Sequence, residues 1–192
     1  MRRGFLLSLV EDTIRLRRYS WAMNASSESF LFRSKRWSFW LTFVTIFLAD
    51  FVTKRWAERH LAPMYTPHKV VGDVVRMTLA FNKDAAMGLT LGAYSRVGFT
   101  LIAVIVLIGL GIFYRRIPAS ATVHATGLGL IAAGALGNLA DRVLFSHGVV
   151  DFIDVGIGSS RFYTFNVADA SITCGAVLLA ILSQSGPARS AT

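Results

Sequence analysis

Four aspartates stand within or beside apolar sequence in the C-terminal half of this chain: Asp141, Asp151, Asp154 and Asp169. Ionisable side chains are costly to bury in hydrocarbon, so a membrane chain keeps them where they have a use. Two carboxyl groups brought close together cannot both ionise easily, and they share one proton. One of them can then activate water while the other protonates the developing oxyanion or the leaving amine. This is the chemistry of an aspartic protease, which needs neither a nucleophilic side chain nor a metal.

Asp151 and Asp169 are the two aspartates that we expect to form such a pair. Asp151 lies in the apolar run VVDFIDV, whose side chains should desolvate its carboxyl group and favour the protonated form. The alternative is that Asp151 and Asp154 are two solvated loop charges. Asp169 follows Asn166 by three residues before another apolar run, which is the spacing of a helix capping box. A capping role and a catalytic role are compatible, because the helix dipole favours an ionised carboxylate in the first turn.

Two further pairs of polar residues have the i, i+4 spacing that places side chains on one face of a helix. Asn138 and Arg142 form the first pair, and Arg142 could either contact a substrate or form a structural ion pair with Asp141. Asp50 and Lys54 form the second pair, at the end of a span, where a local ion pair and a functional role both remain open.

The sequence offers no pattern typical of a metal or cofactor site. The four histidines lack metal-ligand spacing, and no glycine-rich loop of the phosphate-binding kind is present. The single cysteine, Cys174, excludes an intrachain disulfide, and its apolar surroundings indicate an unreactive core thiol. We therefore expect no cofactor and no metal.

The composition is that of a membrane protein. Hydrophobic residues make up 54% of the 192 residues and charged residues only 16%, and the apolar residues are grouped in blocks. The formal charge of +9 would suit a nucleic-acid-binding protein, but the basic residues cluster beside the apolar blocks, as topology signals do. We therefore expect the chain to contact membrane lipids and no nucleic acid.

Four apolar segments have lengths in or near the window of about 17–25 residues that a helix needs to cross a bilayer. Small residues recur every four positions in the third segment, at Gly129, Ala133 and Gly137, which favours close helix packing. Four spans place both termini on one side, and the basic residues near the N-terminus and at 115–116 predict that this side is cytoplasmic. The four segments are 37–56, 97–113, 121–145 and 167–183.

The segments outside the spans differ in character. Residues 1–36 carry eight Lys or Arg against three acids and no small-residue cleavage site, so we expect a basic cytoplasmic extension and no removable signal. Loops 57–95 and 146–166 should lie outside, and the β-branched residues of 70–82 predict one or two short strands. The membrane domain then covers residues 37–184, and a short cytoplasmic tail covers 185–192.

Four polar blocks of this chain resemble, in order, those of bacterial lipoprotein signal peptidase, also called signal peptidase II. DFVTK at 50–54 resembles D-Q-x-T-K, and NKDAAMG at 82–88 resembles N-x-G-A-A-F-G. The most specific matches are GNLADR at 137–142 with VVDFID at 149–154, and FNVAD at 165–169. The resemblance covers about residues 37–183, and the sequence departs from the family pattern at Phe51, Asp84 and Met87.

The resemblance implies an all-α membrane protein with four transmembrane helices and a small extracytoplasmic β-cradle from the first outer loop. It implies an aspartic endopeptidase of the bacterial cytoplasmic (inner) membrane, with its active site near the extracytoplasmic surface. The substrates would be prolipoproteins, cut on the N-terminal side of a diacylglyceryl-modified cysteine, and we expect the enzyme to be a monomer. The implied residues are Asp151 and Asp169 as the catalytic pair, Asn82, Asn138, Arg142 and Asn166 as substrate-binding or positioning residues, and Asp50, Lys54 and Asp141 as supporting residues.

Two other functions are compatible with a small polytopic protein. A proton-coupled transporter also uses intramembrane acids, but it would place them nearer mid-span. Here Asp50, Asp141 and Asp169 gather toward one surface. A non-catalytic membrane scaffold gives no reason for four matching polar blocks. The sequence therefore favours the peptidase.

Overall fold

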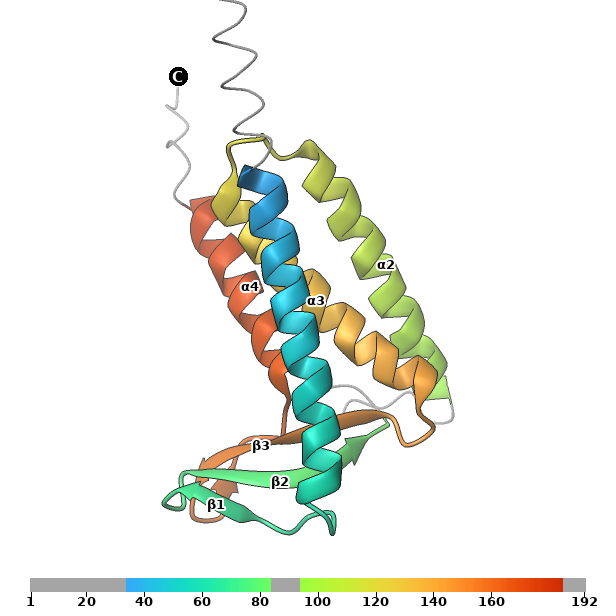
Figure 1. Ribbon diagram of the computed structural model, residues 1–192, viewed down its shortest axis with the longest axis vertical. Helices are drawn as coiled ribbons and strands as arrows, with labels where there is room; N and C mark the ends of the chain where they lie inside the picture. The colour runs from blue at the N-terminus through green and yellow to red at the C-terminus, as the bar shows by residue number, and fades with distance from the viewer. Residues whose placement is uncertain (1–33, 84–93, 185–192) are drawn as a thin grey trace, which may run out of the picture.

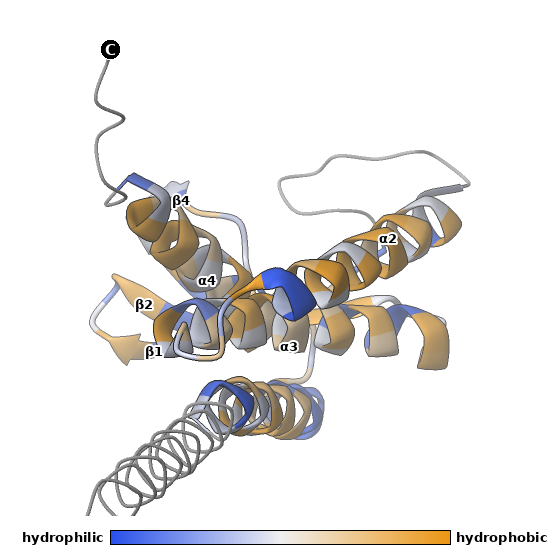
Figure 2. Cartoon of the chain, turned by 90° about the horizontal axis from the view of Figure 1, so that it is seen from above, coloured by the Kyte–Doolittle hydropathy of each residue, from blue (hydrophilic) through white to orange (hydrophobic). Residues whose placement is uncertain are grey.

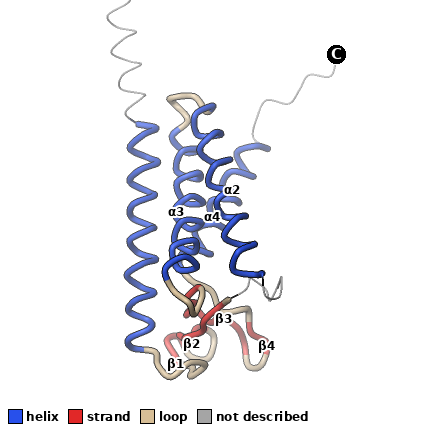
Figure 3. Tube along the Cα trace, turned by 90° about the vertical axis from the view of Figure 1, so that its right-hand side faces the viewer, coloured by secondary structure: helices blue, strands red, loops and turns tan. Residues whose placement is uncertain are grey.

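The computed structural model describes residues 34–83 and 94–184. In these two stretches four helices stand side by side, and a small antiparallel sheet lies across one end of them (Figure 1, Figure 3). The helices are residues 34–60, α2 Ser95–Arg116, α3 Thr122–Leu144 and α4 Val167–Gln184. All four apolar segments singled out in the sequence are therefore helical.

The surface of the bundle is apolar and its interior contains charge. Helices α2, α3 and α4 are long and apolar enough to cross a membrane, and apolar residues dominate them in Figure 2. Helix 34–60 exposes Leu41 and Leu48 while it buries Asp50 and Lys54. This arrangement is the reverse of a helix on a water-soluble protein, which turns its polar face outward. It suits a chain surrounded by lipid, where polar groups must find partners inside the protein.

Helix α3 packs against both α2 and α4. Small residues of α3 also allow helix 34–60 to approach it closely. A Cβ added to Gly137 would lie 2.5 Å from Asp50 Oδ2, and one added to Gly129 would lie 2.9 Å from the Phe39 carbonyl oxygen. The close approach predicted from the small residues of this segment is confirmed at these two positions, which face helix 34–60.

The sheet has the strand order β1-β2-β3-β4, and every neighbouring pair is antiparallel. Strands β1 His68–Val71 and β2 Val75–Asn82 confirm the strands predicted within residues 70–82. Strands β3 Val149–Ile157 and β4 Ser160–Arg161 come from the connection between α3 and α4. The sheet therefore draws on both connections, whereas the sequence predicted a cradle from the first one alone. The chain is also not all-α.

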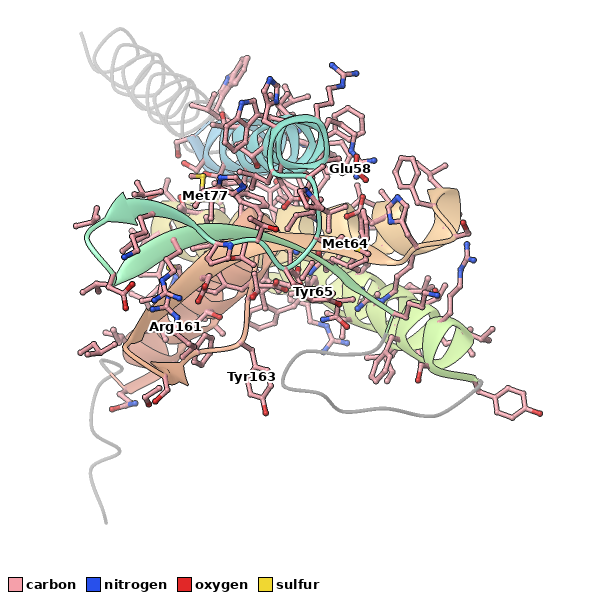
Figure 4. The ribbon with its side chains drawn as sticks, turned by 90° about the horizontal axis from the view of Figure 1, so that it is seen from below. Glu58, Met64, Tyr65, Met77, Arg161 and Tyr163 are labelled. Carbon is pink, nitrogen blue, oxygen red and sulfur yellow. The ribbon has the colours of Figure 1, made fainter. Side chains whose placement is uncertain are left out.

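The sheet is fixed to the bundle by an apolar core at the end of helix 34–60. Ala57 and Leu61 pack there against Leu79, Val150 and Phe152 of the sheet. Figure 4 views this junction from below, with the end of the helix lying against the sheet beside the labelled Glu58 and Met77. Because β2 and β3 are clamped in this way, the polar residues at their ends hold fixed positions relative to the helices.

Candidate active site

Asp151 lies in β3, opposite Ala80 of β2, and it is only 3% exposed. Its Oδ1 accepts a hydrogen bond of 2.7 Å from Asn166 Nδ2, and its Oδ2 accepts one of 3.2 Å from Asn82 Nδ2. The sequence predicted a desolvated Asp151, and the structure confirms it. The sequence did not predict the strand, because the apolar run VVDFIDV falls in the segment 146–166 that was expected to be a loop.

Asp169 is the third residue of α4, and Asn166 caps that helix. The Asp169 amide donates to Asn166 Oδ1 at 2.9 Å, and the Asn166 amide donates to Asp169 Oδ2 at 3.2 Å. This reciprocal pattern is the capping box predicted from the spacing of the two residues. The remaining carboxylate oxygen, Asp169 Oδ1, accepts a hydrogen bond of 2.8 Å from Asn138 Nδ2.

The side-chain amide of Asn166 connects the two aspartates. Besides Asp151 Oδ1, its Nδ2 lies 3.1 Å from Asn138 Oδ1 and 3.2 Å from the Val150 carbonyl oxygen. Asn166 is 0% exposed, so it sits behind the pair. Two asparagines from different elements thus join β3, α3 and α4 at one point.

The pKa of Asp151 is raised to about 7 from its ordinary value of 3.8. Burial is the largest cause, and the negative charge of Asp169 adds to it. Hydrogen bonds from Asn82 and Asn166 and the charge of Lys54 oppose the rise. At neutral pH Asp151 therefore retains a proton in a substantial fraction of molecules, as a general acid requires.

A cavity of about 700 Å³ opens beside the two aspartates. Asp151 and Asp169 both line it, and its other polar walls include Asn82, Asn138 and Arg142. Aromatic residues between β4 and α4 form a further wall, and Tyr163 projects outward there in Figure 4. The complete lining is Ala80, Phe81, Asn82, Lys83, Asn138, Arg142, Val149, Asp151, Phe162, Tyr163, Thr164, Phe165, Asp169, Ala170, Thr173 and Cys174.

Arg142 lies in the last turn of α3, beside this cavity. Its Nη1 donates to the Asn138 carbonyl oxygen at 3.2 Å, and its guanidinium carbon lies 5.9 Å from the centre of the Phe99 ring. Arg96 of α2 donates from Nε to the Arg142 carbonyl oxygen at 2.7 Å and so caps the end of α3. The guanidinium group of Arg142 therefore brings positive charge to the cavity.

The three residues expected to support the site form one buried ion cluster. Lys54 Nζ lies 2.8 Å from Asp50 Oδ2 and 3.0 Å from Asp141 Oδ2. The local Asp50–Lys54 pair is therefore present, and Lys54 also bridges from helix 34–60 to α3. Arg55 adds a second cation, 3.0 Å from Asp141 Oδ1.

Asp154 faces a different environment from Asp151. The two residues are three apart on one strand, so their side chains lie on opposite faces. Asp154 accepts a hydrogen bond of 3.1 Å from Thr78 Oγ1 and one of 2.8 Å from Arg161 Nε, and it does not line the cavity. Asp154 is therefore a buried residue of β3 and not a solvated loop charge.

Some features of the site were not anticipated from the sequence. Arg161 is the partner of Asp154, and only the pairing of β3 with β4 brings the two together. Cys174 is exposed and lines the cavity, so the expectation of a core thiol is wrong. The aromatic residues of RFYTF, directly before Asn166, could have been noticed as a wall of the site. Asp84 and Met87, two of the departures from the family pattern, lie outside the described residues.

Fold and site together define a multi-pass membrane protein with two aspartates on one internal cavity. A family model described as signal peptidase (SPase) II matches residues 42–184. A lipoprotein signal peptidase of Hydrogenovibrio crunogenus is 39% identical over 144 residues, which are 74% of this chain and 81% of that protein. The lipoprotein signal peptidase of Pseudomonas aeruginosa is 40% identical over 146 residues, which are 74% and 84% of the two chains.

The fold is shared with solved structures as well. A bacterial membrane enzyme determined at 2.3 Å resolution superposes with a TM-score of 0.67 at 33% identity, covering 79% of this chain and 92% of the other. A second structure, at 1.9 Å resolution, gives a TM-score of 0.66 at the same identity. This chain belongs to the signal peptidase II family of aspartic peptidases, and its activity is that of a lipoprotein signal peptidase.

Proposed function

We propose that Asp151 and Asp169 are the catalytic pair with which this enzyme cleaves prolipoproteins on the N-terminal side of a diacylglyceryl-modified cysteine. The observation that carries the proposal is that both carboxyl groups border one cavity, while Asn166 hydrogen-bonds to both residues from behind. The four other aspartates of the described chain do not border this cavity.

The reaction assigns a different role to each acid. Asp169 takes a proton from a water molecule as the water oxygen attacks the scissile carbonyl carbon, and Asp151 gives its proton to the carbonyl oxygen. The carbon–nitrogen bond then breaks, the leaving amine takes the proton from Asp169, and the hydroxyl of the intermediate returns a proton to Asp151. The raised pKa of Asp151 supports its role as the acid. The position of Asp169 in the first turn of α4 supports its role as the base, because the helix dipole favours a negative charge there.

Asn82 and Arg142 are suited to hold the substrate. Both border the cavity, and both carry N–H donors that can bind the backbone carbonyl groups of an extended peptide. Asn138 borders the cavity as well, while Asn166 is buried and acts by positioning the pair. The apolar wall formed by Phe162 and Tyr163 offers a surface for the signal helix or the acyl chains.

We further propose that helix 34–60 crosses the membrane with α2, α3 and α4, and that the sheet lies at the extracytoplasmic surface. Four spans then return both termini to the cytoplasm, with residues 1–36 as an extension and 185–192 as a tail of the domain 37–184. The exposed apolar side chains of helix 34–60 support its insertion, and the paired arginines at the end of α2 support the orientation. We also propose that the enzyme acts as a monomer.

The test of the catalytic pair is cleavage of a diacylglyceryl-modified prolipoprotein by purified variants in detergent. We expect Asp151→Asn and Asp169→Asn each to lower kcat by about 10⁴-fold or more, because each removes one of the two proton-transferring groups. Asp154→Asn is the matched control, a buried aspartate on the same strand that does not reach the cavity, and it should keep most of the activity. Cleavage near the wild-type rate by either pair variant would rule the assignment out.

Occupancy of the cavity by substrate can be measured separately from catalysis. Cys174 is the single cysteine of the chain and lines the cavity, so its reaction with a maleimide reports access to it. In the Asp169→Asn variant, which binds without cleaving, saturating prolipoprotein should slow this reaction at least severalfold. A precursor that lacks the diacylglyceryl group should protect less. Equal labelling with and without the modified precursor would place the substrate elsewhere.

A further inference from the structure

The ion cluster of Asp50, Lys54 and Asp141 lies directly behind the two catalytic aspartates. Asp50 and Lys54 are each 1% exposed and Asp141 is 3% exposed, although the proposed chemistry uses none of them. Bringing three charged groups out of water is costly, and the cost is offset only when the partners are well placed. The role of the cluster should therefore be visible in what else its members contact.

Each member of the cluster also binds a group adjacent to the catalytic pair. Asp50 Oδ1 accepts a hydrogen bond of 2.9 Å from the amide of Ala168, the residue before Asp169. Asp141 Oδ2 accepts one of 3.3 Å from the amide of Val150, the residue before Asp151. The cluster thus holds the backbone on which both catalytic aspartates are carried.

Lys54 makes the third of these contacts, and it reaches the catalytic pair through Asn138. Its Nζ donates to Asn138 Oδ1 at 2.9 Å. An ammonium group can only donate hydrogen bonds, so Asn138 must turn its oxygen toward Lys54 and its Nδ2 toward Asp169. The same oxygen accepts from Asn166 Nδ2, which leaves the Asn166 oxygen for the Asp169 amide. Lys54 therefore favours one direction of the Asn138 amide, whereas the Asp169 N–H and the Val150 carbonyl oxygen set the direction of the Asn166 amide.

The consequence is that every oxygen of the two catalytic carboxyl groups accepts a hydrogen bond from nitrogen. Asn166 and Asn82 donate to Asp151, while Asn138 and the Asn166 amide donate to Asp169. If the Asn138 amide were reversed, its oxygen would face the Asp169 carboxylate and repel it. The affinity of the two carboxyl groups for a proton would then change.

We propose that Lys54 is a positioning residue that fixes the direction of the Asn138 amide and so sets the protonation of the catalytic pair. This inference rests on the proposed function of Asp151 and Asp169. The positive charge of Lys54 also acts on the pair directly, because it lowers the pKa of Asp151 and so opposes the effect of burial.

The charged groups that act on Asp151 come from three of the elements around it. They are Asp169 of α4, Arg142 of α3 and Lys54 of helix 34–60. Strand β2 contributes the neutral Asn82, which donates to Asp151, and Lys83 borders the same cavity. Replacement of Lys54 alters one of these charges while the others stay, so the pH dependence of cleavage reports its contribution.

The test compares Lys54→Met with Lys35→Met by measuring kcat and KM across pH with diacylglyceryl-modified prolipoprotein. Lys35 is a matched control: it lies on the same helix, is 9% exposed, and donates from Nζ to the Ile117 carbonyl oxygen at 2.7 Å. We expect Lys54→Met to lower kcat by roughly 10²-fold with KM within about twofold, since a misplacement of catalytic groups acts on the chemical step. The alkaline limb of its kcat–pH profile should move to higher pH by roughly half a unit or more, because the loss of the positive charge makes Asp151 hold its proton more tightly.

The Asp50→Asn variant should shift the kcat–pH profile in the opposite direction, and it tests the inference even if Lys54→Met does not fold. This variant keeps the side-chain size but removes a negative charge, so the charge of Lys54 is less compensated and the alkaline limb should move downward. Lys35→Met should leave the limb unmoved, whatever it does to stability. Unchanged limbs in both cluster variants, or the same change in Lys35→Met, would overturn the inference.

The two proposals fail in different ways. If Asp151→Asn or Asp169→Asn retains normal cleavage, the proposed function is wrong and the role of Lys54 falls with it. If both are inactive while the cluster variants keep the wild-type kcat and pH profile, the catalytic pair stands and only the positioning role of Lys54 is refuted.

Discussion

Two aspartates of the same strand, Asp151 and Asp154, differ in their partners far more than in their burial. Their residues are 3% and 8% exposed, and both carboxyl groups accept hydrogen bonds through both oxygens. Asp154 meets a guanidinium group, which satisfies an ionised carboxylate. Asp151 accepts hydrogen bonds from two neutral amides and lies near the charge of Asp169, and its pKa is raised to about 7. Because the two residues are buried to a similar degree, the charge of their hydrogen-bonding partners is what distinguishes them.

Removing Asn166, one of the two neutral partners of Asp151, should have the largest effect on cleavage. Asn166→Ala deletes the amide that donates to Asp151 and binds Asn138, so the two carboxyl groups proposed as the catalytic pair lose their common support. We expect kcat to fall by roughly 10²-fold or more, because displacements of about 1 Å in a catalytic group have effects of this size. The measurement is prolipoprotein cleavage per mole of folded enzyme. A variant that folds and cleaves like wild type would show that this amide is not needed for cleavage, and the contrast between Asp151 and Asp154 would not hold.

The stability of the protein should depend on pH through Asp151. Its folded-state pKa of about 7 lies above its ordinary value of 3.8, so the folded state holds the proton more tightly than the unfolded state. The resulting stabilisation is complete below about pH 4 and is lost as pH rises through about 7, and its full size is of the order of 4 kcal/mol.

This pH effect can be isolated by comparing wild-type enzyme with Asp151→Asn in thermal unfolding in detergent. The wild-type Tm should fall between pH 4 and pH 7 by more than the Tm of the variant, in which residue 151 does not titrate. Parallel curves for the two proteins would contradict the assignment of the raised pKa to Asp151.

Removing the charged partner of Asp154 should lower stability and leave catalysis intact. Arg161→Ala removes hydrogen bonds to Asp154 Oδ1 and to the Asp73 carbonyl oxygen, and it leaves a nearly buried carboxylate without its cation. We expect a loss of about 1.5–3 kcal/mol, the usual range for hydrogen bonds to charged groups. Tm in detergent gives the loss, and kcat per folded enzyme should stay within about threefold. A collapse of kcat comparable to that of Asn166→Ala would mean that both faces of β3 serve catalysis.

The smallest effect belongs to the other partner of Asp154. Thr78→Val preserves shape and removes one hydroxyl donor, 3.1 Å from Asp154 Oδ2. We expect about 1 kcal/mol of destabilisation, visible as a shift of Tm by a few degrees, with cleavage and its pH profile unchanged. A shift of the pH profile in this variant would show that Asp154 is electrostatically coupled to the catalytic pair.

The site could be predicted from sequence where its contacts are local. The capping box needs only the three-residue spacing between Asn166 and Asp169, and the ion pair of Asp50 with Lys54 needs only one helical turn. The choice of Asp151 as the desolvated acid followed from its apolar neighbours. The opposing role of Asp154 could not be read in this way, because Arg161 reaches it only after β3 pairs with β4.

By itself, the sequence determined the four helices, the strands within residues 70–82 and the capping box of Asn166 with Asp169. These follow from apolar block length, β-branched composition and spacings of three or four residues, all of which act between near neighbours. Only the tertiary structure decided that β2 pairs with β3, that Asp151 and Asp169 share one cavity, and that Lys54 lies between two carboxylates of different helices. Such contacts depend on strand register and helix packing between distant segments, and no local pattern of residues records them.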